Sequence, residues 1–135
     1  VEYARAGHTS LLIRSPDDHV EVISPDGPAP GLLPPAIAPS YDTFSFTWEP
    51  GMALMLYTDG ISEAINDEQE EYTQERLVDL WQRSDDGPVR AAEAIFADVQ
   101  GFAGGQQQAD DQTLVLLQRP ARRAGKKDEE EAVNG

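Results

Sequence analysis

Residues 54–67 read LMLYTDGISEAIND, an apolar run that ends in Asp59-Gly60 and continues at once into a polar, acidic segment. The apolar stretch 52–58 is typical of a central strand, which is buried on both faces. Glycine lets the backbone turn sharply and come close to a ligand. The stretch therefore predicts a buried strand that presents the carboxylate of Asp59 at its tip and then turns at Gly60.

The rest of the chain predicts a run of strands, then two helices, then one strand, which is an α+β order with a largely antiparallel sheet. Thr73 is a suitable N-cap for the first helix, and Pro88 suits the first turn of the second. In the second helix, Ala92, Ile95, Phe96 and Val99 have the spacing of one apolar face. The expected strands are 1–6, 10–14, 19–24, 43–48, 52–58 and 113–117, and the first helix is 74–83.

Two segments have compositions that disfavour regular structure. Residues 25–40 contain six prolines and two glycines, which predict a loop, either a surface connection or a flap beside an active site. Residues 120–135 are charged and of low complexity, and we expect a disordered tail there. We assign 1–119 to one domain, and because Val1 begins in a strand we expect an upstream portion to be missing.

Composition excludes several classes of function. A net charge of −15 opposes binding to nucleic acid. The absence of cysteine removes disulfides, thiol nucleophiles and thiolate metal sites, and fits a cytoplasmic protein. No apolar run approaches the roughly 18 residues that a membrane span needs. The acidic residues concentrate in 59–86. This segment contains ten of them and two basic residues, Arg76 and Arg83.

Two acidic spots adjoin strong strands: Asp59 follows 52–58, and Asp110-Asp111 precede 113–117. If these strands are neighbours of suitable polarity, the carboxylates meet at one edge of the sheet. Oxygen ligands of this kind suit Mg²⁺ or Mn²⁺, which activate water and neutralise phosphoryl groups. Spacing alone leaves another interpretation open, in which Asp-Gly is an ordinary turn and the Asp pair merely caps a loop.

Other catalytic motifs do not match the sequence. A haloacid-dehalogenase nucleophile would stand at position 57, which is Tyr57. Residues 66–71, NDEQEE, lack the glycine of a calcium-binding hand. Neither a G-x-S-x-G elbow nor a phosphate-binding glycine loop is present. His8 and His19 are too isolated to indicate zinc.

Several segments occur together in one order, and together they resemble the C-terminal part of PPM-type, metal-dependent serine/threonine phosphatases. The resemblance covers about residues 1–119 and is nearest to the bacterial branch of stage II sporulation protein E and the Rsb regulators of stress sigma factors. Its most specific parts are LYTDG with E-A-x-N behind it, and D-D-x-T. The segments are AGHTSLLI (6–13), PGLLP (30–34), FTWEPGMALMLYTDGISEAIND (46–67), YTQERL (72–77) and ADDQTLVLLQR (109–119).

The resemblance implies an α-β-β-α sandwich with a two-metal site between largely antiparallel sheets. It maps metal binding to Asp59, Gly60 and Asp110, with Asp111 and Thr113 in support and no catalytic residue beyond the metal ligands. His8 matches the histidine of the family's A-G-H segment. Two roles are open for it: a structural residue of a turn, or a catalytic residue. Glu63 and Asn66 follow Asp59 on an expected short helix. Three alternatives are open for them: they support the site, they contact substrate, or they belong to a solvated face of the helix.

The implied reaction is direct hydrolysis of a phosphoserine or phosphothreonine protein by water activated between two Mn²⁺ or Mg²⁺ ions. In this branch the substrate is often an anti-sigma-factor antagonist, which implies sigma factor regulation. The family carries further metal-binding aspartates upstream, in a segment that this sequence does not contain. An alternative is therefore a non-catalytic, truncated phosphatase-like binding module. A third interpretation, an acidic antiparallel interaction domain, explains the composition but not the coincidence of motifs.

Overall fold

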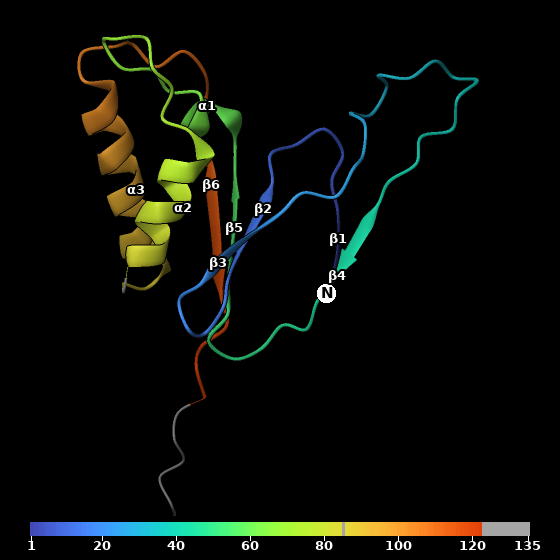
Figure 1. Ribbon diagram of the computed structural model, residues 1–135, viewed down its shortest axis with the longest axis horizontal. Coiled ribbons are helices and arrows are strands. Elements are labelled where there is room, and N and C mark those ends of the chain that lie inside the picture. The colour runs from blue at the N-terminus through green and yellow to red at the C-terminus, as the bar shows by residue number, and fades with distance from the viewer. Residues whose placement is uncertain (85, 123–135) are drawn as a thin grey trace, which may run out of the picture.

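The computed structural model describes residues 1–84 and 86–122. Five strands come first, followed by three helices and a sixth strand, in the expected α+β order (Figure 1). The strands are β1 (Glu2–Ala4), β2 (Leu11–Arg14), β3 (Val20–Ile23), β4 (Thr43–Ser45), β5 (Ala53–Tyr57) and β6 (Leu114–Gln118), and the helices are α1 (Asp59–Ser62), α2 (Gln74–Arg83) and α3 (Pro88–Ala103).

The main sheet has four antiparallel strands in the order β3-β2-β5-β6. β5 lies inside the sheet and pairs with β2 through Met55 and Leu12 and with β6 through Leu54 and Leu117. The prediction of a central strand is confirmed, because an apolar run without alternation suits a strand that has a partner on both sides and a covered surface on both faces.

Helices α2 and α3 cover one face of this sheet (Figure 1). Leu12, Met55 and Tyr57 of the sheet share a buried cluster with Trp81 of α2 and Ile95 of α3. The hydroxyl of Thr73 accepts a hydrogen bond from the Arg76 N–H, which confirms the predicted N-cap. Pro88 begins α3 as expected, since its missing N–H has no partner at that position in any helix.

The buried face of α3 differs from the prediction by one residue. Ala91, Ile95 and Val99 are buried, whereas Ala92 and Phe96 are only half-buried. An i, i+4, i+8 row is inclined to the helix axis, and the inclination of α3 on the sheet selects this row. The periodicity of the sequence thus predicted that α3 has one apolar face, but it did not predict which residue lies at the centre of that face.

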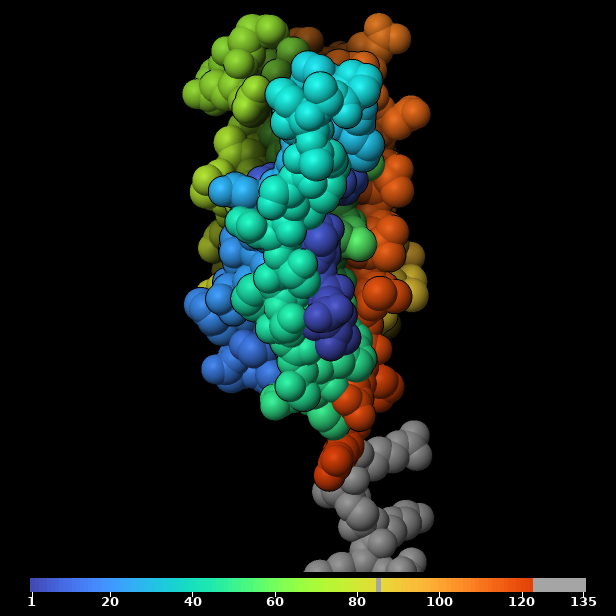
Figure 2. Space-filling view, turned by 90° about the vertical axis from the view of Figure 1, so that its right-hand side faces the viewer, coloured from blue at the N-terminus to red at the C-terminus, as the bar shows by residue number. Residues whose placement is uncertain are grey.

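The other face of the main sheet is covered by the two-stranded sheet of β1 and β4. Phe44, Phe46 and Trp48 point into this second apolar layer, as the alternation over 43–48 predicted, although β4 itself ends at Ser45. Figure 2 looks onto this layer, where the segment that contains β4 runs along the molecule with β1 beside it. Val115 and Leu117 of β6 are exposed.

One helical layer and two antiparallel sheets therefore stack in the order α-β-β, which is three of the four layers of an α-β-β-α sandwich. Residues 25–40 form no helix or strand, in agreement with the prediction of a loop, and project at the end of the sheet where β5 meets α1 (Figure 1). The tail expected over 120–135 lies outside the described residues from 123 onward. Within the described residues, no helix is long and apolar enough to cross a membrane.

Candidate functional site

The pairing of β5 with β6 brings the two acidic segments to one edge of the main sheet. Tyr57 pairs with Leu114, and beyond this pair the Thr58 N–H donates to the Thr113 carbonyl at 3.0 Å. Because the strands are antiparallel, the residue after β5 meets the residues before β6. The structure thus satisfies the condition under which Asp59 and Asp110-Asp111 lie at the same edge.

A hydroxyl that the sequence did not single out joins the two segments. Thr58 Oγ1 donates to the Asp111 carbonyl at 3.0 Å and accepts from the Thr113 N–H at 2.9 Å. Thr113 was expected to support the site, and it does contribute its backbone, but the bridging side chain belongs to Thr58. Its signal in the sequence was weak, because threonine is common at the end of any strand.

Gly60 allows the chain to turn at the end of β5. It is buried, and a Cβ atom built on it would lie 2.3 Å from the carbonyl oxygen of Asp111. Only glycine allows this close approach of two backbones. The Gln112 side chain fastens the contact by donating from Nε2 to the Gly60 carbonyl at 3.1 Å. The turn after β5 is therefore locked against the segment before β6.

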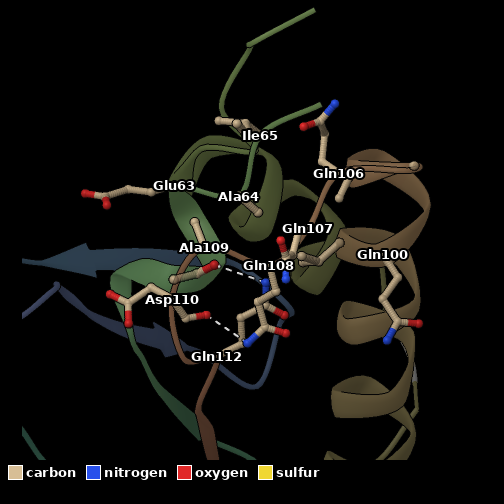
Figure 3. A pocket seen from close by; sticks show the side chains of 14 residues that line it. Glu63, Ala64, Ile65, Gln100, Gln106, Gln107, Gln108, Ala109, Asp110 and Gln112 are labelled. Atoms are coloured by element: carbon tan, nitrogen blue, oxygen red, sulfur yellow. Dashed lines mark hydrogen bonds between the residues drawn. The ribbon is translucent and has the colours of Figure 1, made fainter. Parts of the chain in front are cut away.

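The carboxylates at this edge remain accessible. Asp59 and Asp110 are both exposed, and within the described residues neither forms a salt bridge. Asp110 Oδ1 accepts from the Asp111 N–H at 2.7 Å, which orients the carboxylate and leaves Oδ2 open. Its backbone is held in turn by Gln108, whose Nε2 donates to the Asp110 carbonyl at 2.8 Å (Figure 3).

These donors fit part of a divalent cation site. Carboxylate and carbonyl oxygens are the ligands that Mg²⁺ and Mn²⁺ prefer. The described residues contain no group of three or more His, Cys, Asp or Glu side chains placed to hold a metal. Octahedral geometry needs six ligands, so water, substrate or residues outside this sequence would have to complete the shell.

Two residues expected near the site have distinct positions. Glu63 follows α1 directly, and its N–H donates to the Asp59 carbonyl at 2.8 Å. Asn66 shapes a turn, since its Oδ1 accepts from the Glu68 and Glu70 N–H groups at 3.0 and 2.9 Å. Asn66 is thus occupied by backbone, whereas the exposed Glu63 side chain is available.

His8 lies at the turn between β1 and β2. Its Nδ1 is 3.1 Å from Thr9 Oγ1, and that hydroxyl donates to the Tyr57 carbonyl. The contact fastens the turn to the end of β5. His8 also lines a cavity of about 360 Å³ together with Arg5, Thr58 and Thr113. These contacts are consistent with a structural role for His8 in the turn.

A second cavity, of about 370 Å³, opens on the opposite side of the edge, between α1, the end of α3 and the segment 104–112 (Figure 3). Gly60 and Asp110 belong to its wall, so it is continuous with the acidic edge. Val99 and Ala64 contribute apolar surface. Five glutamines also line it: Gln100, Gln106, Gln107, Gln108 and Gln112.

Comparison with known families identifies the fold. The family described as Stage II sporulation protein E (SpoIIE) matches residues 1–120, nearly the whole described chain. The chain belongs to this family. The PPM-type resemblance inferred from LYTDG and D-D-x-T is thereby confirmed.

Individual relatives agree with the family assignment. The Protein IcfG of a Synechocystis strain is 25% identical over 119 residues, which are 88% of this chain and 18% of that protein. The phosphatase domain of SpoIIE from Bacillus subtilis superimposes with a TM-score of 0.67 at 18% identity, over 92% of this chain and 54% of that one. The SiaA-PP2C domain of Pseudomonas aeruginosa gives 0.62 at 21% identity, over 81% and 42%.

The chain covers only part of the length of these relatives. The chain spans about half of the solved phosphatase domains and less than a fifth of IcfG. A crystal of the Bacillus subtilis domain presoaked with Mn has the same fold as this chain, with a TM-score of 0.63 at 20% identity. The matches establish a SpoIIE-type phosphatase fold for this chain.

Proposed function

We propose that this chain forms part of a protein serine/threonine phosphatase that hydrolyses a phosphoserine or phosphothreonine protein with two Mn²⁺ or Mg²⁺ ions. The observation that carries the proposal is the meeting of Asp59 and Asp110 at one sheet edge, with both carboxylates exposed. Membership of the SpoIIE family and the Mn-presoaked crystal of a relative support the choice of chemistry.

The proposed roles follow from the contacts. Asp59 and Asp110 would hold metal through carboxylate oxygens, and the Gly60 carbonyl is a third oxygen donor with one lone pair already engaged by Gln112. When bound, the metals supply activated water and neutralise charge on the phosphoryl group. Thr58 and Asp111 position the two carboxylates, because their hydrogen bond joins the segments that carry them.

The substrate proposal is narrower. The likeness to the branch of sporulation and Rsb regulators favours a phosphorylated anti-sigma-factor antagonist in the cytoplasm, and hence a part in sigma factor regulation. An alternative is a non-catalytic, phosphatase-like binding module. It draws support from the described residues, which hold no group of three potential metal ligands.

The test measures Mn²⁺-dependent phosphate release from a phosphoserine peptide by this chain and by Asp59→Asn. Mn²⁺ binding, measured by calorimetry, provides a second readout that does not depend on turnover. We expect Asp59→Asn to weaken Mn²⁺ binding and to abolish any release that the parent chain supports. The absence of release by this chain alone would agree with an incomplete metal shell, and the assay is then repeated with the rest of the phosphatase domain restored. No release there, at unchanged folding, would favour the binding module.

A further inference from the structure

The cavity beside Asp110 offers more hydrogen-bond acceptors than free donors. Three of its glutamines already donate from Nε2 to protein oxygens: Gln106 to Asp67 Oδ1 at 2.7 Å, Gln108 to the Asp110 carbonyl and Gln112 to the Gly60 carbonyl. Each of these amide nitrogens keeps one N–H for other partners, whereas the carbonyl oxygen of the same side chain has two lone pairs. The polar lining is therefore biased toward accepting hydrogen bonds.

The charges around the cavity have the same bias. Its lining includes the carboxylates of Glu63 and Asp110, and within the described residues no lysine, arginine or histidine lines it. Figure 3 shows both carboxylates pointing outward from the rim of the cavity, away from Gln100 and Gln106 on the side of α3. Because Asp110 is also a proposed metal ligand, the negative charge left to attract a cationic side chain is that of Glu63 and of the acidic turn nearby.

An acidic turn adds to this field. Residues 66–71 are joined to the cavity wall through the hydrogen bond between Asp67 and Gln106. They carry four exposed carboxylates, those of Asp67, Glu68, Glu70 and Glu71. Exposed carboxylates of one sign raise the local concentration of cationic groups even where they do not touch them.

The interior suits the alkyl stem of a long side chain. Val99, Ala64, Ile65 and Ala103 line the cavity between the polar groups. Lysine and arginine bury their methylene stems against apolar surface while the charged head reaches polar partners. A volume of about 370 Å³ is at the lower end of the range for ligand pockets and accommodates one such side chain.

We infer that this cavity binds an arginine or lysine side chain of the phosphoprotein substrate, close to the phosphorylated residue. The inference rests on the proposed function, since it deepens the specificity of the same site. Gly60 and Asp110 are shared by the acidic edge and the cavity. Because an extended chain advances at most about 3.3–3.6 Å per residue, the basic residue lies one to three positions from the phosphoserine.

The test compares phosphoserine peptides that carry arginine, or its neutral isostere citrulline, at each of the three positions on either side. Binding is measured by fluorescence anisotropy with Mn²⁺ present, and phosphate release is measured separately. At the preferred position we expect the arginine peptide to bind about five- to tenfold more tightly, a preference that added salt reduces.

Variants locate the preference. Glu63→Gln and Gln100→Lys each raise the net charge by one at the cavity, and we expect both to reduce the ratio of arginine to citrulline affinity. Glu93→Gln is the matched control, because it makes the same charge change at an exposed residue of α3 that does not line the cavity. A folding defect would weaken both peptides alike and leave the ratio unchanged.

The outcomes separate this inference from the proposed function. Equal affinity for arginine and citrulline at every position, or a preference that Glu93→Gln reduces as much as Glu63→Gln, would overturn the basic-residue pocket. Phosphate release by such a protein would leave the phosphatase proposal standing. A preference that depends on Glu63, without Mn²⁺-dependent release even when the rest of the phosphatase domain is present, would support the pocket and contradict the phosphatase proposal.

Discussion

Asp98 and Asp110 are aspartates of the same chain with opposite surroundings. Asp98 accepts hydrogen bonds from the Tyr72 hydroxyl at 2.6 Å and from Arg76 Nε at 3.1 Å. Arg76 in turn lies over the rings of Tyr72 and Phe102, 5.1 and 4.7 Å from their centroids. Among the residues that the structure describes, the Asp110 carboxylate accepts a hydrogen bond only from the N–H of Asp111, and it remains exposed.

The difference separates a structural carboxylate from an available one. Partial burial raises the pKa of Asp98, but the hydrogen bonds from Arg76 and Tyr72 outweigh it and leave that pKa below its ordinary value. Burial, then the hydrogen bond and charge of Asp98, raise the pKa of Tyr72. These groups satisfy one another and join α2 to α3. At the β5–β6 edge the backbone is fixed while the carboxylates stay open, which is the arrangement that a ligand site requires.

The largest expected effect is on catalysis, from Asp110→Asn. We expect phosphate release to fall by at least about 100-fold, because a neutral amide is a poorer ligand for a hard divalent cation. The free energy of unfolding should change by less than about 0.5 kcal/mol, since the side chain is exposed. Initial rates of phosphate release test the predicted loss of activity, and urea unfolding tests the predicted stability. A large loss of stability would remove the contrast with Asp98.

The reverse result is expected for Asp98→Asn. Loss of the charge weakens two charge-assisted hydrogen bonds, and we expect the free energy of unfolding to fall by about 1–2 kcal/mol while phosphate release is retained. Asp79→Asn is the matched control, because Asp79 pairs with Arg83 at 2.6 Å but both side chains are about two-thirds exposed. Its expected cost is below about 0.5 kcal/mol. Equal losses in both variants would contradict a special role for the Tyr72–Arg76–Asp98 cluster.

A smaller effect is expected from Thr58→Val, which keeps the shape of the side chain and removes the hydroxyl between Asp111 and Thr113. We expect a loss of about 1 kcal/mol in the free energy of unfolding and a several-fold drop in phosphate release, because the edge is less well fixed. Thr47→Val is the control at an exposed position. Unchanged activity would show that Gly60 and Gln112 alone hold the edge.

The pH dependence of stability sharpens the comparison further. The lowered pKa of Asp98 means that its ionised form stabilises the fold above the unfolded value, about 3.9, and that this contribution is lost as pH falls through the folded pKa. The gap in unfolding free energy between the parent and Asp98→Asn should stay constant from about pH 7 to 5 and shrink below about pH 4. A gap that persists at acid pH would assign it to packing rather than charge.

Local patterns predicted most elements of this fold because they depend on neighbours in the sequence. The apolar run 52–58, the Thr73 cap and Pro88 at the start of α3 each follow from residue-level preferences. On α3, Ile95 and Val99 are buried as predicted, but Ala91 takes the buried position expected for Ala92, since packing on the sheet depends on distant side chains. β4 proved shorter than 43–48, because the antiparallel pairing stops at Ser45, opposite Glu2, the residue with which its partner β1 begins.

The sequence by itself determined that Asp59-Gly60 ends a central strand, that Asp110-Asp111 precede the last strand and that the motifs belong to a phosphatase family. Tertiary structure alone decided that these strands are neighbours, that Thr58 rather than Thr113 supplies the bridging hydroxyl and that five glutamines converge on one cavity. The physical reason is that motifs record local chemistry, whereas hydrogen bonds between residues more than 50 positions apart exist only once the sheet has fixed its register.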